Sequence, residues 1–316
     1  MSINYAGLFN LLRRKKISLS KMSQTLGFSS ATRAKFSQGE YVSLKTLALI
    51  CEYLDATLDE IVKFESKQPP FYLYTRLKEE MEHKIKGGIY HETQILLTYN
   101  SNHIEGSRLS YEQTRYIYET NTIGSDMSTT INVDDIIETS NHFRCIDDMI
   151  KTALEPLNEQ LIKDLHKLLK TGTSDANLSW FALGDYKKNP NTVGGNDTVQ
   201  PDQVANEMAT LIDKYEQKKQ HSFEDIIEFH YEFEAIHPFQ DGNGRVGRLI
   251  ALKECLRHGH IPFTVDEDVK LFYYRGLKHW PLQRGFLIDT CLTGQDKYRD
   301  LLHKLNIAPP ENQEVK

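Results

Sequence analysis

Apolar residues recur at helical spacing along most of this chain, and runs with the strict alternation of a strand are few. The segment 222–236 is one clear case, in which Ser222 is suited to cap the helix and Pro238 ends it soon afterwards. A second helical pattern covers about 245–258 and stops at Gly259. We therefore expect a mostly α protein in which the residues between these two helices form a loop.

Four shorter helical patterns occupy the start of the chain, over residues 5–14, 19–26, 30–37 and 44–54. Gly27 separates the second pattern from the third. Because two short helices joined by a glycine turn make a helix-turn-helix, this segment is expected to fold as a small helical bundle of that type.

Charge is distributed unevenly along the chain. The first 50 residues contain eight Lys and Arg residues and one acidic residue, which is a net charge of +7. The whole chain has a formal net charge of −6, so the remainder carries −13. Such asymmetry indicates a nucleic-acid contact surface near the N-terminus. The alternative is a small interaction module whose basic residues are merely solvated.

The length of 316 residues is enough for two domains with separate cores. The proline pair in Gln68-Pro69-Pro70 indicates a hinge between them. We expect a helix-turn-helix domain over residues 1–66, a main domain over 67–310 and a frayed tail over 311–316.

The four cysteines are scattered along the chain without the CxxC spacing of a zinc site. This pattern favours buried free thiols in a reducing cytosol. The chain has no run of about eighteen apolar residues and no secretory signal at its start. We therefore expect a cytoplasmic protein without a membrane span.

The loop between the two main helices contains the residue types that phosphate chemistry needs, in His-Pro-Phe-Gln-Asp-Gly-Asn-Gly-Arg-Val-Gly-Arg over residues 237–248. His237 can accept a proton near neutral pH, and Asp241 can bind a hard cation such as Mg²⁺. The other candidates would bind phosphate oxygens through backbone N–H groups or guanidinium groups. They are Gly242, Gly244, Gly247, Arg245 and Arg248.

Taken singly, each of these residues has a simpler interpretation, because a histidine at a helix end is usually a core residue and Asp-Gly-Asn-Gly is usually a turn. A hydrolytic metal centre built from His230, His237 and Asp241 is another alternative. The chain has no HExxH or similar pairing to support it, so His230 is expected to pack inside its helix face.

The loop closely resembles the motif of the Fic family, H-P-F-x-(D/E)-G-N-G-R-x-x-R, with every fixed position matched and Gln240 at the variable one. Members typically transfer AMP from ATP to a hydroxyl group of a protein. The resemblance implies a Fic helical fold, with ATP and Mg²⁺ as partners. It gives each matched residue a role: His237 as the base, Asp241 as the metal ligand, Gly242, Asn243 and Gly244 as the anion hole, Arg245 and Arg248 as ligands of the β- and γ-phosphates, and Phe239 as a core anchor.

A second segment, Ser101-Asn-His-Ile-Glu105-Gly106, matches the inhibitory motif of the same family, (S/T)-x-x-x-E-(G/N). The resemblance implies an inhibitory helix around residues 97–108. Glu105 on that helix would pair with Arg248 and put a carboxylate where the phosphate charge must lie. Ser101, one helical turn earlier, would face the same way.

Two further features of the main domain resemble the family. The segment 184–195 is expected to form a β-hairpin flap that binds an extended target segment by strand addition, with Tyr186, Lys187, Thr192 and Val193 as docking residues. Relatives commonly have Arg where this chain has Lys187. Tyr273, which precedes Tyr274, resembles a residue that lies near the nucleotide in relatives.

The N-terminal segment resembles the Cro/C1-type DNA-binding domain over roughly residues 5–64. The resemblance implies that one short helix reads the major groove or its phosphates, and that two copies of the domain share two half-sites, which makes a homodimer plausible. The residues that would face DNA are Ser29, Ser30, Thr32, Arg33 and Lys35.

The sequence as a whole therefore predicts an autoinhibited Fic-type adenylyltransferase that modifies a Ser, Thr or Tyr hydroxyl of a target protein or of itself. The rival hypothesis is a DNA-binding transcriptional regulator whose Fic domain only senses nucleotide. The intact His237 and Asp241 argue against it, since a sensor needs neither. A weaker rival keeps the enzyme but transfers phosphate, another nucleotide or phosphocholine.

Overall fold

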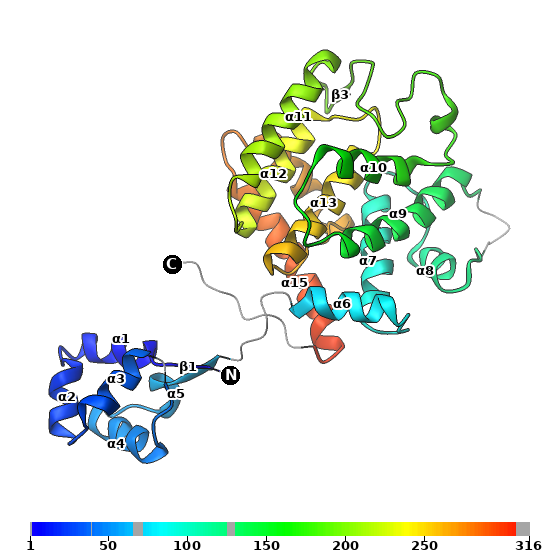
Figure 1. Ribbon diagram of the computed structural model, residues 1–316. Coiled ribbons are helices and arrows are strands. Elements are labelled where there is room, and N and C mark those ends of the chain that lie inside the picture. Colours follow the sequence, from blue (N-terminus) through cyan, green and yellow to red (C-terminus); the bar gives the residue numbers. More distant parts are fainter. Residues whose placement is uncertain (1, 39, 66–71, 125–129, 308–316) are drawn as a thin grey trace. The chain divides into compact units, whose positions relative to one another are not determined.

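The computed structural model describes residues 2–38, 40–65, 72–124 and 130–307, and these residues fall into two compact units, residues 1–69 and 70–316 (Figure 1). The expected hinge at Gln68-Pro69-Pro70 and the expected tail over 311–316 lie outside the described residues. In the described part of the chain the secondary structure is mostly helical, which confirms the expected fold class.

The N-terminal unit is a bundle of short helices, and hydroxyl side chains begin several of them. Ser18 accepts a hydrogen bond from the Lys21 amide, and Ser43 accepts one from the Thr46 amide. Gly27 adopts a φ of +71° between the second and third helices, in the left-handed region that favours glycine. The helices are α1 (Ala6–Arg14), α2 (Leu19–Thr25), α3 (Ser30–Gln38), α4 (Leu44–Leu54) and α5 (Leu58–Ile61).

A two-stranded antiparallel sheet closes this unit, pairing β1 (Ser2–Asn4) with β2 (Lys63–Glu65). The sequence did not predict these strands, because three residues are too few to establish an alternating pattern. Apolar side chains from all five helices form the core, among them Leu8, Met22, Phe36, Ile50 and Ile61. The pairing joins the two ends of the unit around that core.

The larger unit consists of helices and one short hairpin. Its helices are α6 (Tyr72–Glu82), α7 (Ile89–His103), α8 (Tyr111–Thr120), α9 (Val133–Lys151), α10 (Glu159–Lys170), α11 (Pro201–Glu216), α12 (Phe223–Ile236), α13 (Asn243–His258), α14 (Glu267–His279) and α15 (Gly285–Lys304), with a 3₁₀ turn at Asp175–Asn177. The hairpin pairs β3 (Thr192–Val193) with β4 (Asn196–Asp197). In the described part of the chain, no helix is long and apolar enough to cross a membrane.

Helix α13 lies at the centre of this unit and packs against α12, α10, α9 and α7 (Figure 1). Its residues are buried on nearly every side, including the apolar Val246, Leu249 and Ile250. A helix that is covered all round is a rigid support. The loop that leads into α13 is therefore positioned by the core of the domain.

Candidate active site

The loop between α12 and α13 has a left-handed residue at each end. His237 has φ 52° and ψ 61°, and Gly242 has a φ of 83°. Between them the Phe239 ring is fully buried and stacks on the His166 ring, with centroids 4.0 Å apart. Phe239 is thus an anchor for the loop, as the family resemblance implies.

The side chain of Asn243 closes the loop instead of facing a ligand. Its Oδ1 accepts a hydrogen bond from the Phe239 amide at 2.8 Å, and its Nδ2 donates to the Phe239 carbonyl at 2.8 Å. Because both groups of the amide are occupied, only the backbone N–H of Asn243 remains for the anion hole. That N–H belongs to the N-terminus of α13, which favours negative charge.

His237 is largely buried, and its surroundings disfavour the charged form of its imidazole. Burial, together with the positive charge of Lys187, lowers the pKa of His237 to about 4. The nearby Glu234 carbonyl acts in the opposite direction and is the smaller influence. At neutral pH the imidazole is therefore uncharged and can accept a proton.

Asp241 belongs to a network of buried charges. Its Oδ2 accepts hydrogen bonds from Lys170 Nζ at 2.6 Å and from Arg245 Nη2 at 3.3 Å. Burial opposes ionisation, but the charges of Arg245 and Lys170 lower the pKa of Asp241 to about 2. The side chain is still 48% exposed, so an ionised carboxylate remains open to a ligand.

Lys170 and Glu138 complete this network, and sequence reasoning missed both. Lys170 Nζ donates to Glu138 Oε1 at 2.5 Å, and Arg245 Nη1 donates to Glu138 Oε2. The only signal for Lys170 was its place as the last residue of an amphipathic helix that faces the motif. Arg245 is 7% exposed, which makes it a partner of Glu138 and Asp241 in this structure rather than an open phosphate ligand.

Arg248 lies on the other side of the loop and is held by the segment around the second motif. Its Nε donates to Ser101 Oγ at 3.0 Å, and its Nη2 donates to the Ser101 carbonyl at 3.0 Å. Nη2 also donates to Glu105 Oε1 at 2.8 Å. The three residues that the sequence associates are therefore brought together.

The expected helix over 97–108 needs a correction, since α7 ends at His103 and Glu105 lies in the turn that follows. Gly106 ends the helix by adopting a φ of +104°, and the Ser107 amide donates back to the Asn102 carbonyl. The Glu105 amide donates to the Asn102 carbonyl, so a hydrogen-bonded turn presents the carboxylate to Arg248.

The Glu105 carboxylate occupies the space beside Gly244. A Cβ atom added at Gly244 would lie 2.2 Å from Glu105 Oε1. Gly244 thus leaves room for an anion at the N-terminus of α13, and in this structure that anion is Glu105. Gly247 has another task, because its added Cβ would lie 2.6 Å from Glu234 Oε1 on α12.

Tyr273 and His230 form a buried pair behind Arg248. The Tyr273 hydroxyl and His230 Nε2 are 2.6 Å apart, and each residue is 1% exposed. Tyr273 thus supports the site from within the core. The expectation that it lies near a nucleotide is corrected, because its ring is buried in this structure. His230 is packed as expected. In the part of the chain that the structure describes, no group of three or more His, Cys, Asp or Glu residues could hold a metal ion.

The hairpin is shorter than expected and lies later in the chain, with strands at Thr192–Val193 and Asn196–Asp197 instead of an extent of 184–195. Its turn consists of Gly194 and Gly195, which both have positive φ. Thr192 and Val193 lie on it and are exposed. Tyr186 and Lys187 lie before it and are buried, so their docking role is corrected. The Tyr186 ring packs near Phe239, and Lys187 is tied into the loop.

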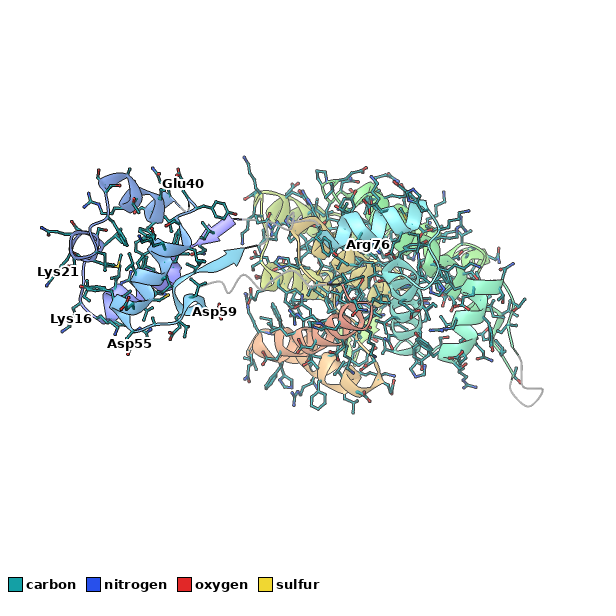
Figure 2. The ribbon with its side chains drawn as sticks, turned by 90° about the horizontal axis from the view of Figure 1, so that it is seen from below. Lys16, Lys21, Glu40, Asp55, Asp59 and Arg76 are labelled. Carbon is teal, nitrogen blue, oxygen red and sulfur yellow. The ribbon has the colours of Figure 1, made fainter. Side chains whose placement is uncertain are left out.

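The residues expected to face DNA lie along α3 and just before it, from Ser29 ahead of the first turn to Lys35 in the last turn. Ser29 Oγ accepts a hydrogen bond from the Thr32 amide and so caps this helix. Arg33 Nη1 donates to Ser20 Oγ on α2 at 3.0 Å, while Ser30 and Lys35 are exposed. Other basic side chains of this unit, including Lys16 and Lys21, also point outward (Figure 2).

The buried network predicts a stability effect. We expect Lys170→Met to lower the free energy of unfolding by about 3–5 kcal/mol, because Glu138 and Asp241 lose a buried counter-charge. Lys167→Met, an exposed lysine on the same helix, should stay within about 0.5 kcal/mol of the wild type. Urea unfolding of the full chain measures both, and equal midpoints for the two variants would contradict the prediction.

Comparisons with known proteins agree with this geometry. Residues 156–255 match the model of the Fic/DOC family, and residues 8–67 match the Cro/C1-type HTH DNA-binding domain. A Fic domain containing signaling protein from Bacteroides thetaiotaomicron has a similar fold, with a TM-score of 0.60, 21% identity and coverage of 76% of this chain and 98% of that one. A Fic family protein from Desulfovibrio desulfuricans has a TM-score of 0.58 and 24% identity, over 79% of this chain and 78% of that one.

The curated relatives are longer than this chain. "Protein adenylyltransferase fic-1" of Caenorhabditis briggsae is 25% identical over 202 residues, which are 59% of this chain and 36% of that protein. "Protein adenylyltransferase Fic" of Drosophila willistoni is 27% identical over 190 residues, 57% of this chain and 35% of that protein. The chain thus spans about a third of the length of these relatives. The chain therefore resembles the Cro/C1-type HTH DNA-binding domain over residues 8–67 and the Fic/DOC family over residues 156–255.

Proposed function

We propose that this chain transfers AMP from ATP to a Ser, Thr or Tyr hydroxyl of a protein, with release of pyrophosphate. The observation that carries the proposal is a His237 with a lowered pKa in the loop that leads to the N-terminus of α13, within a segment that matches the Fic/DOC family. The names of the distant relatives support the same reaction. The modified hydroxyl would belong either to a second protein or to this chain itself.

In the proposed reaction His237 accepts the proton of the target hydroxyl. The hydroxyl oxygen forms a bond to the α-phosphorus of ATP, and the bond from that phosphorus to the pyrophosphate oxygen breaks. The backbone N–H groups at the start of α13 would stabilise the charge that develops on the phosphate. Arg248 would bind the terminal phosphates once its partner Glu105 has left.

Asp241 suits the role of a Mg²⁺ ligand. It is an ionised oxygen donor with an exposed side, and Mg²⁺ usually takes one or two carboxylates together with substrate phosphates and water. When bound, the cation would neutralise phosphate charge. Lys170 and Arg245 would hold the carboxylate in place for it.

We also propose that Glu105 restrains the reaction. Its carboxylate pairs with Arg248 and lies where Gly244 leaves room for an anion. A terminal phosphate of ATP would compete for the same space and the same guanidinium. Productive binding of ATP therefore requires Glu105 to move away.

We expect Glu105→Gly to raise AMP transfer about tenfold to a hundredfold, since a hydrogen bond to a charged group is worth about 1.5–3 kcal/mol. Adding His237→Ala should lower it again by a factor of about 10²–10⁴, which is the contribution of a general base. The assay incubates each variant with Mg²⁺ and ATP labelled at the α or the γ phosphate, and measures the label retained on protein. Label retained from the α position alone identifies AMP transfer, and retention from the γ position identifies phosphate transfer.

Glu112→Gly, an exposed acidic residue on α8, is the matched control and should behave as the wild type. The Glu105→Gly variant could bind ATP and yet transfer no AMP to itself or to candidate target proteins. That result would favour the rival hypothesis that the Fic domain only senses nucleotide. Equal rates of AMP transfer by Glu105→Gly and the wild type would show that Glu105 does not inhibit the reaction.

The pKa of His237 also predicts a pH dependence. Because burial lowers that pKa to about 4, the base stays uncharged from neutral pH down to about pH 5. Protonation of His237 should therefore lower the rate of AMP transfer by the Glu105→Gly variant only as the pH falls through about 4. Initial rates over pH 3.5–8 measure this, and an acid limb near the ordinary histidine value of about 6.5 would contradict it.

A second proposal is that the N-terminal unit binds DNA, which its match to the Cro/C1-type domain and its charge of +7 over the first 50 residues support. Fluorescence anisotropy with duplex DNA at several salt concentrations tests it. We expect Lys35→Ala to weaken binding and to reduce the salt slope by about 1, because one phosphate contact is lost. Lys151→Ala in α9 should leave the slope unchanged, and an absence of salt-dependent binding would exclude the proposal.

A further inference from the structure

Lys187 holds the backbone on both sides of His237. Its backbone N–H donates to the Pro238 carbonyl at 2.9 Å, and its Nζ donates to the Ile236 carbonyl at 3.4 Å. A single residue therefore contacts the carbonyl groups of the residues before and after the candidate base. These contacts come from outside the two helices that the loop connects.

His237 needs such support because of its backbone conformation. A φ of 52° with a ψ of 61° is left-handed, and few residues other than glycine adopt it. Residues in such sparsely populated regions are strained, and they persist only when the surrounding contacts hold them there. Lys187 supplies two of the contacts that do so.

The same ammonium group joins the two ends of the hairpin. Lys187 Nζ donates to Asn191 Oδ1 at 2.7 Å and to Thr198 Oγ1 at 2.6 Å. Asn191 precedes β3 and Thr198 follows β4, and the Thr198 amide donates to the Asn191 carbonyl at 3.3 Å. Asn191 Nδ2 also donates to the Phe239 carbonyl at 3.0 Å. The base of the hairpin and the loop thus share one set of hydrogen bonds.

The burial of Lys187 distinguishes it from a residue that meets a target at the surface. It is 2% exposed, and its three ammonium protons have three acceptors. Among the described residues, no carboxylate forms an ion pair with it, and burial lowers its pKa to about 8. A buried charge without a counter-charge is costly, so its retention needs a purpose that an apolar side chain could not serve.

We infer that Lys187 is a positioning residue that couples the β3–β4 hairpin to the orientation of His237. A target segment bound to the exposed hairpin would hold Asn191 and Thr198 in place. Through Lys187, these two residues would in turn hold the carbonyl groups of Ile236 and Pro238 on either side of His237. The inference deepens the proposed AMP transfer and rests on it. Its geometric part, the coupling of hairpin and loop, can be tested without activity.

The first experiment is amide hydrogen exchange on the full chain, comparing Lys187→Met with the wild type. We expect exchange at least tenfold faster in both the 190–199 segment and the 236–240 segment, with the rest of the larger unit unchanged. Lys188→Met is the matched control, since the adjacent lysine is exposed, and it should exchange as the wild type. Lys187→Arg should keep most of the protection, because it retains the charge and the donors.

Thr198→Val provides a second route if Lys187→Met does not fold. It removes one acceptor of the ammonium group while keeping the shape of the side chain. Faster exchange in the 236–240 segment, which does not include Thr198, is the expected result. Unchanged exchange in that segment, in Lys187→Met or in Thr198→Val, overturns the inference whatever the activity is.

The second experiment measures AMP transfer in the Glu105→Gly background. We expect Lys187→Met to lower kcat at least tenfold while the KM for ATP stays within about twofold, and Lys187→Arg to restore most of the rate. A rise in the KM for ATP with kcat unchanged would overturn the coupling to His237. If Glu105→Gly itself transfers nothing to itself or to candidate targets, the proposed function fails, and the exchange experiment still decides the coupling.

Discussion

The left-handed backbone of His237 is the constraint on which the rest of the site depends. It ends α12 abruptly and turns the chain so that α13 can begin only six residues later, at Asn243. Such a turn is stable only because other segments hold it. The Phe239 ring packs against α10, the Asn243 amide closes the loop, and Lys187 holds the peptides on either side of the histidine. The chemistry of the loop is therefore a property of the packed domain.

Charge on the two sides of the loop is balanced in different ways. On one side Asp241 and Arg245 are held by buried partners, Lys170 and Glu138, which lie on helices of the core. On the other side Arg248 is held by Glu105, which lies on a turn. Removing a buried partner leaves an uncompensated charge, whereas a carboxylate on a turn can be exchanged for another anion. The Asp241 side is thus held by side chains of core helices, whereas Arg248 combines hydrogen bonds to Ser101 on α7 with one carboxylate on a turn.

The sequence predicted the parts of this site that short-range rules determine. The bounds of α12 follow from the Ser222 cap and from the apolar spacing, and both agree with the structure. The association of Ser101 and Glu105 with Arg248 came from a motif match and is also observed. These features depend on residues whose identity alone limits their conformation or their partners.

The remaining parts could not be predicted, because they depend on which surfaces meet. Nothing in the local pattern distinguishes Lys170 from other lysines of its helix, and its role arises only when α10 packs beneath the loop. Lys187 was expected on a surface hairpin because of the family resemblance, and its burial depends on how the loop and the hairpin pack together. The strands β1 and β2 are far apart in sequence and too short for a period to be recognised.

Two glycines of the motif, Gly244 and Gly247, meet different requirements, one for an anion and one for helix packing. Gly244 leaves room for an anion, because any Cβ there would meet the Glu105 carboxylate. Gly247, one turn further along α13, lets α12 approach so closely that Glu234 and His230 lie against its backbone. A larger residue at the first position would block the ligand, and one at the second would push apart the two helices that position His237. The same residue type therefore serves binding at one position and the geometry of the base at the other.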